Sequence, residues 1–203
     1  MNTHHDRSGV SARTNRAILD AAMQLLGRRP DAPLSEIASA AEVGRTTLHR
    51  YYPDRASLVD AISGEAAVRI SAALQRAGLT EGDAREALLR ASRELFDLGP
   101  VLSLVFGPLL SDRPEWRDTG DVEAALVEVV QRGHADDSIN PALTPLWVQS
   151  LLWSMLYAAD SYARDVAASR HQALAMVLCS LDGALRPPTR LSSSNGTNAK
   201  VQQ

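Results

Sequence analysis

The sequence predicts an all-α protein, and two observations support this prediction. Apolar residues recur at helical spacing through most of the chain, and no stretch alternates apolar and polar residues between turn signals as a half-buried strand would. The 203 residues are 45% hydrophobic and 22% charged, which is ordinary for a soluble globular protein. We expect a disordered tail over 1–12, a three-helix head over 13–56, a helical body over 57–186 and a second disordered tail over 187–203.

The head begins with an expected helix over residues 16–26, RAILDAAMQLL, preceded by Arg13. Its buried stripe consists of apolar residues at helical spacing: Ile18, Ala22, Leu25 and Leu26. A second short helix follows, with its own stripe of Leu34, Ile37, Ala38 and Ala41. Ser35 lies near its start, where its side chain is expected to cap a backbone N–H.

The third helix of the head is expected over residues 45–52, after the turn at 41–44. Gly44 is an acceptable N-cap, and Val43 with Leu48 has the spacing of a hydrophobic staple. Leu48 and Tyr52 are four residues apart and share the inner face. The outer side holds small polar and basic residues: Arg45, Thr46, His49, Arg50 and Tyr51. Two short helices joined in this way predict a helix-turn-helix.

The run over residues 37–58, IASAAEVGRTTLHRYYPDRASL, resembles the DNA-binding signature of the TetR family of bacterial repressors. The positions that match or are conservatively replaced are Ile37, Ala38, Val43, Thr47, Leu48, Tyr52 and Leu58. Four positions depart from the pattern: Glu42 stands where a turn Gly is usual, Gly44 replaces a Ser cap, His49 replaces a Tyr, and Arg55 replaces a Lys. The chain length fits a whole member of the family.

The predicted DNA contacts lie on the head. Arg45, Thr46 and Thr47 are expected at base edges or nearby phosphates, since Arg pairs with guanine and a Thr methyl touches thymine. The resemblance implies phosphate contacts from Ser35, Thr47, His49, Tyr51 and Arg55, with Arg50 beside them. Arg13 and Arg16 are candidates for additional arm or backbone contacts. The alternative is a helix-turn-helix that serves only in packing.

The charge distribution agrees with DNA contact through one end. The whole chain carries a net charge of −3, but residues 1–56 hold eight Arg against six acids, a net +2. The remainder is therefore acidic, with a net −5. A mildly basic head on an acidic body fits a protein that touches DNA only with the head.

The body is expected to contain helices over 57–77, 83–98, 101–110, 121–132, 143–164 and 169–185. Gly64 marks a possible bend, Thr80 a possible cap, and Gly107-Pro108 an interruption. The last two helices are apolar on more than one face and must be covered on several sides. The resemblance implies that they form a homodimer interface, and the alternative is a monomer in which they are central.

Candidate ligand-binding residues are the large aromatics of the body: Phe106, Trp116, Trp147, Trp153, Tyr157 and Tyr162. Trp153 and Tyr157 are four residues apart and could line an apolar pocket, or simply belong to the core. Asp160 on the same helix is a candidate partner for a cationic ligand. An ion pair with Arg164, four residues on, is the alternative.

No catalytic, cofactor or metal site is predicted, because the chain has no phosphate-binding loop, nucleophile elbow or HExxH pattern. The single cysteine, Cys179, indicates a reducing compartment, and the most apolar segment, 146–159, is too short to span a bilayer. We therefore expect a cytoplasmic protein without membrane contact.

The resemblance implies a ligand-responsive regulator, usually a repressor, which binds a palindromic double-stranded operator as a homodimer and responds to a small-molecule effector. One rival is a constitutive DNA-binding dimer without an effector. The other is a helical enzyme or interaction module with a vestigial head. The operator, the effector and the sign of regulation are left open by the sequence.

Overall fold

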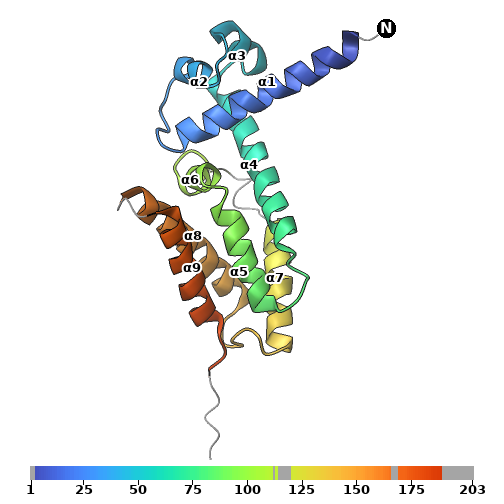
Figure 1. Cartoon of the computed structure of the whole chain (residues 1–203), viewed down its shortest axis with the longest axis vertical. Coiled ribbons are helices and arrows are strands. Elements are labelled where there is room, and N and C mark those ends of the chain that lie inside the picture. The colour runs from blue at the N-terminus through green and yellow to red at the C-terminus, as the bar shows by residue number, and fades with distance from the viewer. Residues whose placement is uncertain (1–2, 112, 114–119, 166–168, 189–203) are drawn as a thin grey trace, which may run out of the picture.

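The computed structural model describes residues 3–111, 113, 120–165 and 169–188, and these form nine helices and no strand. The helices are α1 (Thr3–Leu26), α2 (Leu34–Ala40), α3 (Arg45–Tyr51), α4 (Arg55–Ala77), α5 (Ala84–Phe96), α6 (Pro100–Phe106), α7 (Gly120–Ala135), α8 (Pro145–Asp165) and α9 (Arg170–Leu185). The all-α prediction is confirmed. Figure 1 shows α1, α2 and α3 at one end of an elongated molecule, with the C-terminal end of α9 at the other.

The head is held by side chains that α1, α2, α3 and α4 bury against one another. Ile18, Ile37 and Leu48 are at most 1% exposed, and Tyr52 is 7% exposed. The predicted inner face of α3 is thus confirmed. The Tyr52 hydroxyl donates to Asn15 Oδ1 at 2.6 Å, so this buried phenol keeps a hydrogen-bond partner inside the head.

The turn between α2 and α3 closes through two backbone hydrogen bonds. Val43 N–H donates to Ala38 C=O at 2.9 Å and Glu42 N–H to Ser39 C=O at 3.1 Å, which is a Schellman arrangement. Gly44 is the N-cap of α3, as predicted. The predicted Ser35 cap is wrong: Pro33 occupies the N-cap position without a side-chain bond, because α2 begins at Leu34 and Ser35 already lies inside it.

Glu42 adopts a left-handed backbone conformation, with φ of 56°. A side chain in this region costs about 1–2 kcal/mol, which glycine avoids. We therefore expect Glu42→Gly to raise the free energy of unfolding by about 0.5–1 kcal/mol, measured by denaturant unfolding. Glu42→Ala removes the same charge but keeps the Cβ. An equal gain in both variants would contradict the backbone explanation and point to the charge.

The first helix begins earlier than predicted. The sequence predicts a disordered tail over 1–12, whereas α1 starts at Thr3. The prediction missed these turns because they carry no apolar stripe. They extend a helix that is nucleated by the buried residues from Ile18 onwards, and Ser11 is hydrogen-bonded to Tyr51 of α3.

Helix α4 connects the head to the body. Asp54 is its N-cap, and Ser57 completes a capping box with Asp54. The helix continues through Gly64, so no element boundary falls at the predicted bend. Its residues contact α1 in the head and α5 in the body.

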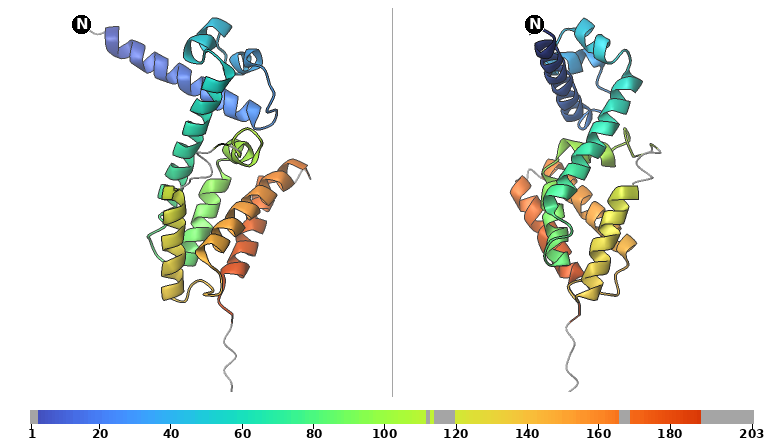
Figure 2. Two further views of the ribbon diagram at one scale, coloured as in Figure 1. Left: turned by 180° about the vertical axis from the view of Figure 1, so that it is seen from behind. Right: turned by 90° about the vertical axis from the view of Figure 1, so that its right-hand side faces the viewer.

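The body is arranged around α5, which contacts α4, α7, α8 and α9. Asp83 caps α5 through Glu86 N–H at 2.9 Å, so the cap predicted at Thr80 is wrong. Helix α6 ends at Phe106, four residues before the predicted end, because the chain turns at Gly107-Pro108. Helix α7 runs on to Ala135, beyond the predicted 132. The left view of Figure 2 shows α5 between α7 on one side and α8 and α9 on the other.

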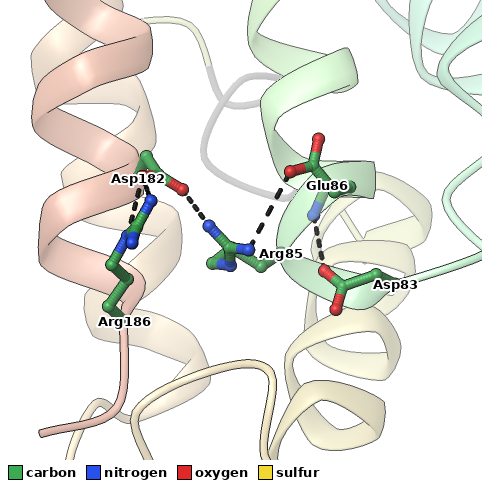
Figure 3. Close-up of polar contacts among 5 residues, drawn as sticks. All are labelled: Asp83, Arg85, Glu86, Asp182 and Arg186. Atoms are coloured by element: carbon green, nitrogen blue, oxygen red, sulfur yellow. Dashed lines mark hydrogen bonds and ion pairs between the residues drawn. The ribbon is translucent and has the colours of Figure 1, made fainter. Parts of the chain in front are cut away.

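An ion-pair group joins the start of α5 to the end of α9. Asp182 binds Arg85 of α5 and also accepts from Arg186 Nη2 at 2.6 Å (Figure 3). The hydrogen bond from Arg186, together with the charges of Arg85 and Arg186, holds the pKa of Asp182 below its ordinary value. The carboxylate form of Asp182 therefore stabilises the folded chain.

Asp182→Asn is expected to lower the free energy of unfolding by about 1 kcal/mol at pH 7. Because the folded-state pKa is depressed, this contribution is complete above the unfolded pKa of about 3.9 and disappears as the pH falls through the folded-state value. The difference between the two proteins should therefore shrink in acid, as measured by denaturant unfolding at pH 7 and at pH 3. The control is Glu128→Gln, which removes a carboxylate at an exposed position of α7. A difference that does not change with pH would contradict this account.

Candidate nucleic-acid interface and ligand site

Helix α3 presents a polar outer face at the end of the head. Arg45, Thr46, His49 and Arg50 are exposed, whereas Thr47 is half-buried. Arg45 is the first residue of the helix, so it lies beside the free backbone N–H groups there. A guanidinium and small hydroxyls at the front of an exposed helix can contact base edges in a major groove.

The C-terminal end of α3 carries hydrogen-bonding groups on several sides. The Tyr51 hydroxyl lies 2.9 Å from Ser11 Oγ and donates to Ser11 C=O at 3.2 Å. The bond with the Ser11 side chain lowers the pKa of Tyr51 below its ordinary value. The Arg50 guanidinium lies 5.5 Å from the centroid of the Tyr51 ring, and His49 Nδ1 is 3.2 Å from Pro53 C=O. These groups can bind phosphate oxygens.

The remaining predicted DNA contacts differ in accessibility. Arg13 and Arg16 are exposed on α1, and Ser35 is half-buried at the start of α2. Arg55 departs most from the prediction, because its guanidinium bonds the loop between α1 and α2. Nη1 donates to Ala32 C=O at 2.7 Å and Nη2 donates to Pro30 C=O. In this structure Arg55 therefore holds that loop to α4, a role that the sequence did not indicate.

Three of the predicted ligand-binding aromatics meet between α6 and α8. The Phe106 ring lies 6.1 Å from Trp153 and 5.4 Å from Tyr157, both edge-to-face. Trp153 and Phe106 are half-buried, and Tyr157 is 50% exposed. The cluster is thus accessible at its rim and offers ring faces and edges to an aromatic ligand.

Asp160 lies one turn further along α8 and is only 4% exposed. Its Oδ2 accepts from Ser103 Oγ at 2.9 Å and lies 3.2 Å from Arg164 Nη1. Arg164 also donates to Ser103 Oγ at 3.0 Å. The pair with Arg164 is the alternative that the sequence left open. Ser103, on α6, was not predicted, because nothing in its local sequence links it to a residue 57 positions away.

The other predicted aromatics among the described residues, Trp147 and Tyr162, do not join this cluster. Trp147 is 59% exposed near the start of α8, and Trp116 lies outside the described residues. On the side of α8 that packs on α9, a groove of about 320 Å³ is lined mainly by apolar side chains. They include Met155, Ala159, Tyr162, Met176 and Val177. In the described part of the chain, no helix is long and apolar enough to cross a membrane.

The fold and the exposed face of α3 define a helix-turn-helix DNA-binding protein, and comparisons with known proteins agree. Residues 18–62 match the profile of the family described as "Bacterial regulatory proteins, tetR family". The HTH-type transcriptional repressor LfrR of Mycolicibacterium smegmatis is 38% identical over 182 residues, which cover 88% of this chain and 93% of the repressor.

Solved structures give the same result. The crystal structure of the TetR-like transcriptional regulator LfrR from Mycobacterium smegmatis in complex with proflavine has a TM-score of 0.68 at 37% identity, covering 87% of this chain and 99% of that one. A TetR family transcription regulator from Marinobacter aquaeolei VT8 also reaches a TM-score of 0.68, at 18% identity, covering 89% of this chain and all of that one, and supports the fold alone. The chain belongs to the TetR family and is a DNA-binding transcriptional regulator.

Proposed function

We propose that this regulator is a repressor that binds a palindromic operator through α3. The observation that supports the proposal is the exposed front of α3, where Arg45 and Thr46 face solvent while Leu48 anchors the helix from behind. In this proposal Arg45, Thr46 and Thr47 read base edges. Phosphates are bound by Arg13, Arg16, Ser35, His49, Arg50 and Tyr51. Arg55 acts mainly by holding the loop between α1 and α2.

The second element of the proposal is a homodimer through α8 and α9. Trp147, Leu151, Ala158 and Tyr162 recur at helical spacing along one side of α8, and Trp147 and Tyr162 are 59% and 37% exposed. On α9, Met176 is 52% exposed, and the chain has no Asp, Glu, Lys or Arg from 171 to 181. An exposed apolar face without charges is typical of a protein interface. This proposal assigns Trp147 to the partner subunit rather than to a ligand.

A dimer assembled in this way would present two copies of α3 to one face of the DNA. Ala158→Arg places a charge in the middle of this face, so we expect it to convert the dimer to a monomer and to weaken operator binding. Sedimentation at fixed protein concentration measures the first effect. A variant that stays dimeric would argue against this interface.

The third element is the effector, which we propose to be a planar aromatic cation bound between α6 and α8. The rings of Phe106, Trp153 and Tyr157 offer stacking surfaces, and the buried carboxylate of Asp160 offers a counter-charge. The Arg164 side chain is 44% exposed, so it can move into water when a cationic ligand takes its place. The LfrR structure with proflavine, a planar aromatic cation, supports the same ligand class.

A ligand bound at this position can affect the head through α6, which contacts both α8 and α1. A Cβ added at Gly27, at the end of α1, would lie 3.2 Å from the Pro100 carbonyl oxygen and 3.4 Å from Ser103 Cβ. A ligand that moves Ser103 therefore moves a residue in direct contact with the head. Such a ligand releases DNA only if it binds the DNA-free state more tightly.

The test uses proflavine as the probe and Asp160→Asn as the variant, with Glu128→Gln, at an exposed position of α7, as the matched control. We expect wild type and control to bind proflavine in DNA-free calorimetry and to release the operator when it is added. Asp160→Asn should bind it about ten- to a hundredfold more weakly, since it loses a charge-assisted contact. Equal affinity in all three proteins would overturn the Asp160 assignment. Operator binding that does not respond to such cations would favour a constitutive dimer.

A further inference from the structure

The first turn of α6 meets three other parts of the molecule. A Cβ added at Gly27, at the end of α1, would lie 3.4 Å from Ser103 Cβ, and Ser103 Oγ donates to Asp160 of α8 at 2.9 Å. Gly99, just before the helix, lies against Arg170 of α9. Figure 1 places α6 between α1 and the helices of the body. The start of α6 is therefore the place where the head, the proposed effector site and α9 come together.

Arg170 binds the end of α5 in two ways. It is the first residue of α9, after the N-cap Ser169. Its guanidinium lies 4.5 Å from the centroid of the Phe96 ring, and Nη2 donates to the Phe96 carbonyl oxygen at 2.6 Å. Phe96 is 2% exposed and is therefore a fixed support in the core. Stacking orients the plane of the guanidinium and the hydrogen bond sets its rotation within that plane, so the two contacts together fix its other N–H groups.

The same guanidinium closes the turn at Gly99. Gly99 has φ of 40° and ψ of −92°, a conformation that glycine adopts without a Cβ clash. A Cβ at this position would lie 3.3 Å from Arg170 Nη1, so the guanidinium packs directly on the glycine backbone. The Gly99 N–H donates at 3.2 Å to the Phe96 carbonyl oxygen, the same atom that Arg170 binds. A glycine joint between two helices can bend, and here Arg170 holds it in one position.

A fixed start determines where a displacement of α6 goes. The proposed ligand would press on Phe106 and Ser103, which lie further along the helix. With the turn at Gly99 held, α6 responds by pivoting about its start, and Ser103 then moves against Gly27 of α1. With that turn free, α6 can shift as a whole by bending at Gly99, and less of the displacement reaches the head.

We propose that Arg170 is a positioning residue for the response to the effector. It fixes the start of α6, so that a ligand bound between α6 and α8 displaces α1 and with it the head. The proposal rests on the proposed effector site and adds how its occupation is transmitted. Arg170 belongs to neither proposed binding surface, so its loss should reduce the coupling between effector and operator without changing the affinity for either one alone.

The experiment compares the wild-type chain with Arg170→Ala and Arg170→Lys, and Arg93→Ala, at an exposed position of α5, is the matched control. Operator affinity is measured without proflavine and with saturating proflavine, and the ratio of the two affinities is the coupling factor. Proflavine affinity is measured on the DNA-free proteins. Amide hydrogen exchange of residues 101–106 in the DNA-free proteins measures how firmly α6 is held.

For wild type and Arg93→Ala we expect proflavine to weaken operator binding by about 10- to 100-fold. In Arg170→Ala the coupling factor should be at least about fivefold smaller, with both single-ligand affinities within about twofold of wild type and faster exchange of the α6 amides. Arg170→Lys keeps a cation at the Phe96 ring but has no planar fork to reach both the carbonyl and Gly99, so its coupling factor should be intermediate.

Equal coupling factors in all four proteins would overturn the role of Arg170, and so would unchanged exchange of the α6 amides in Arg170→Ala. A loss of both single-ligand affinities would overturn it as well, because that result indicates general support of the fold. A wild type whose operator binding does not respond to proflavine would contradict the proposed effector, whereas hydrogen exchange would still decide whether Arg170 fixes α6. The two failures are therefore distinguishable.

Discussion

Arg45→Ala is expected to weaken operator binding at least tenfold, because the guanidinium at the front of α3 is the group best suited to pair with guanine. A bidentate Arg–guanine pair discriminates by about 1–3 kcal/mol, and the proposed symmetric dimer would lose it in both half-sites. The side chain is exposed, so the free energy of unfolding should change little. The measurement is a titration of the selected operator at physiological salt.

Arg93→Ala, at an exposed position of α5 in the body, is the matched control and should bind as wild type does. The Arg45→Ala protein should also lose selectivity at one base-pair position per half-site, because a base contact carries sequence information that a phosphate contact does not. If the Arg45→Ala protein bound the operator with wild-type affinity, Arg45 would not be a DNA-contacting residue.

Phe96→Ala is expected to have the largest effect on stability, lowering the free energy of unfolding by about 3–5 kcal/mol. Phe96 ends α5 and is 2% exposed. The Arg170 guanidinium lies 4.5 Å from its ring centroid and donates to its carbonyl at 2.6 Å, so the ring also orients the start of α9. Truncating the Phe96 side chain both leaves a cavity and removes the cation–π contact with Arg170.

Phe96→Leu keeps most of the volume and should cost less than about 1.5 kcal/mol. Denaturant unfolding at one protein concentration measures both variants, because the proposed dimer would make apparent stability depend on concentration. A loss below about 1 kcal/mol for Phe96→Ala would show that the corner between α5 and α6 repacks easily.

The parts of the fold that sequence predicted are those set by local chemistry. Helical spacing predicts the inner face of the third helix at Leu48 and Tyr52, and both side chains are buried. The sequence also shows Glu42 at a turn position where the family pattern usually has Gly. The positive φ of Glu42 explains why glycine is usual there, since glycine adopts this conformation without steric cost. The family resemblance rested on the same short stretch.

The parts that sequence missed depend on contacts between distant residues. Ser103 meets Asp160 only because α6 packs on α8, and Arg55 reaches Ala32 only because α4 passes the loop after α1. Neither contact leaves a periodic or spacing signal. The start of α1 was missed for a different reason: from Gly9 to Ala17 no side chain is buried, so no apolar pattern marks this part of the helix.

Selection of bound sequences from random DNA, with the purified protein at physiological salt, tests the central claim most directly. A dimer with two copies of α3 predicts recovery of a palindrome whose half-sites lie one helical turn, or a multiple of it, apart. Arg45→Ala should fail to enrich the same palindrome. Recovery of no enriched sequence, or of a single asymmetric site, would contradict a symmetric operator-binding dimer.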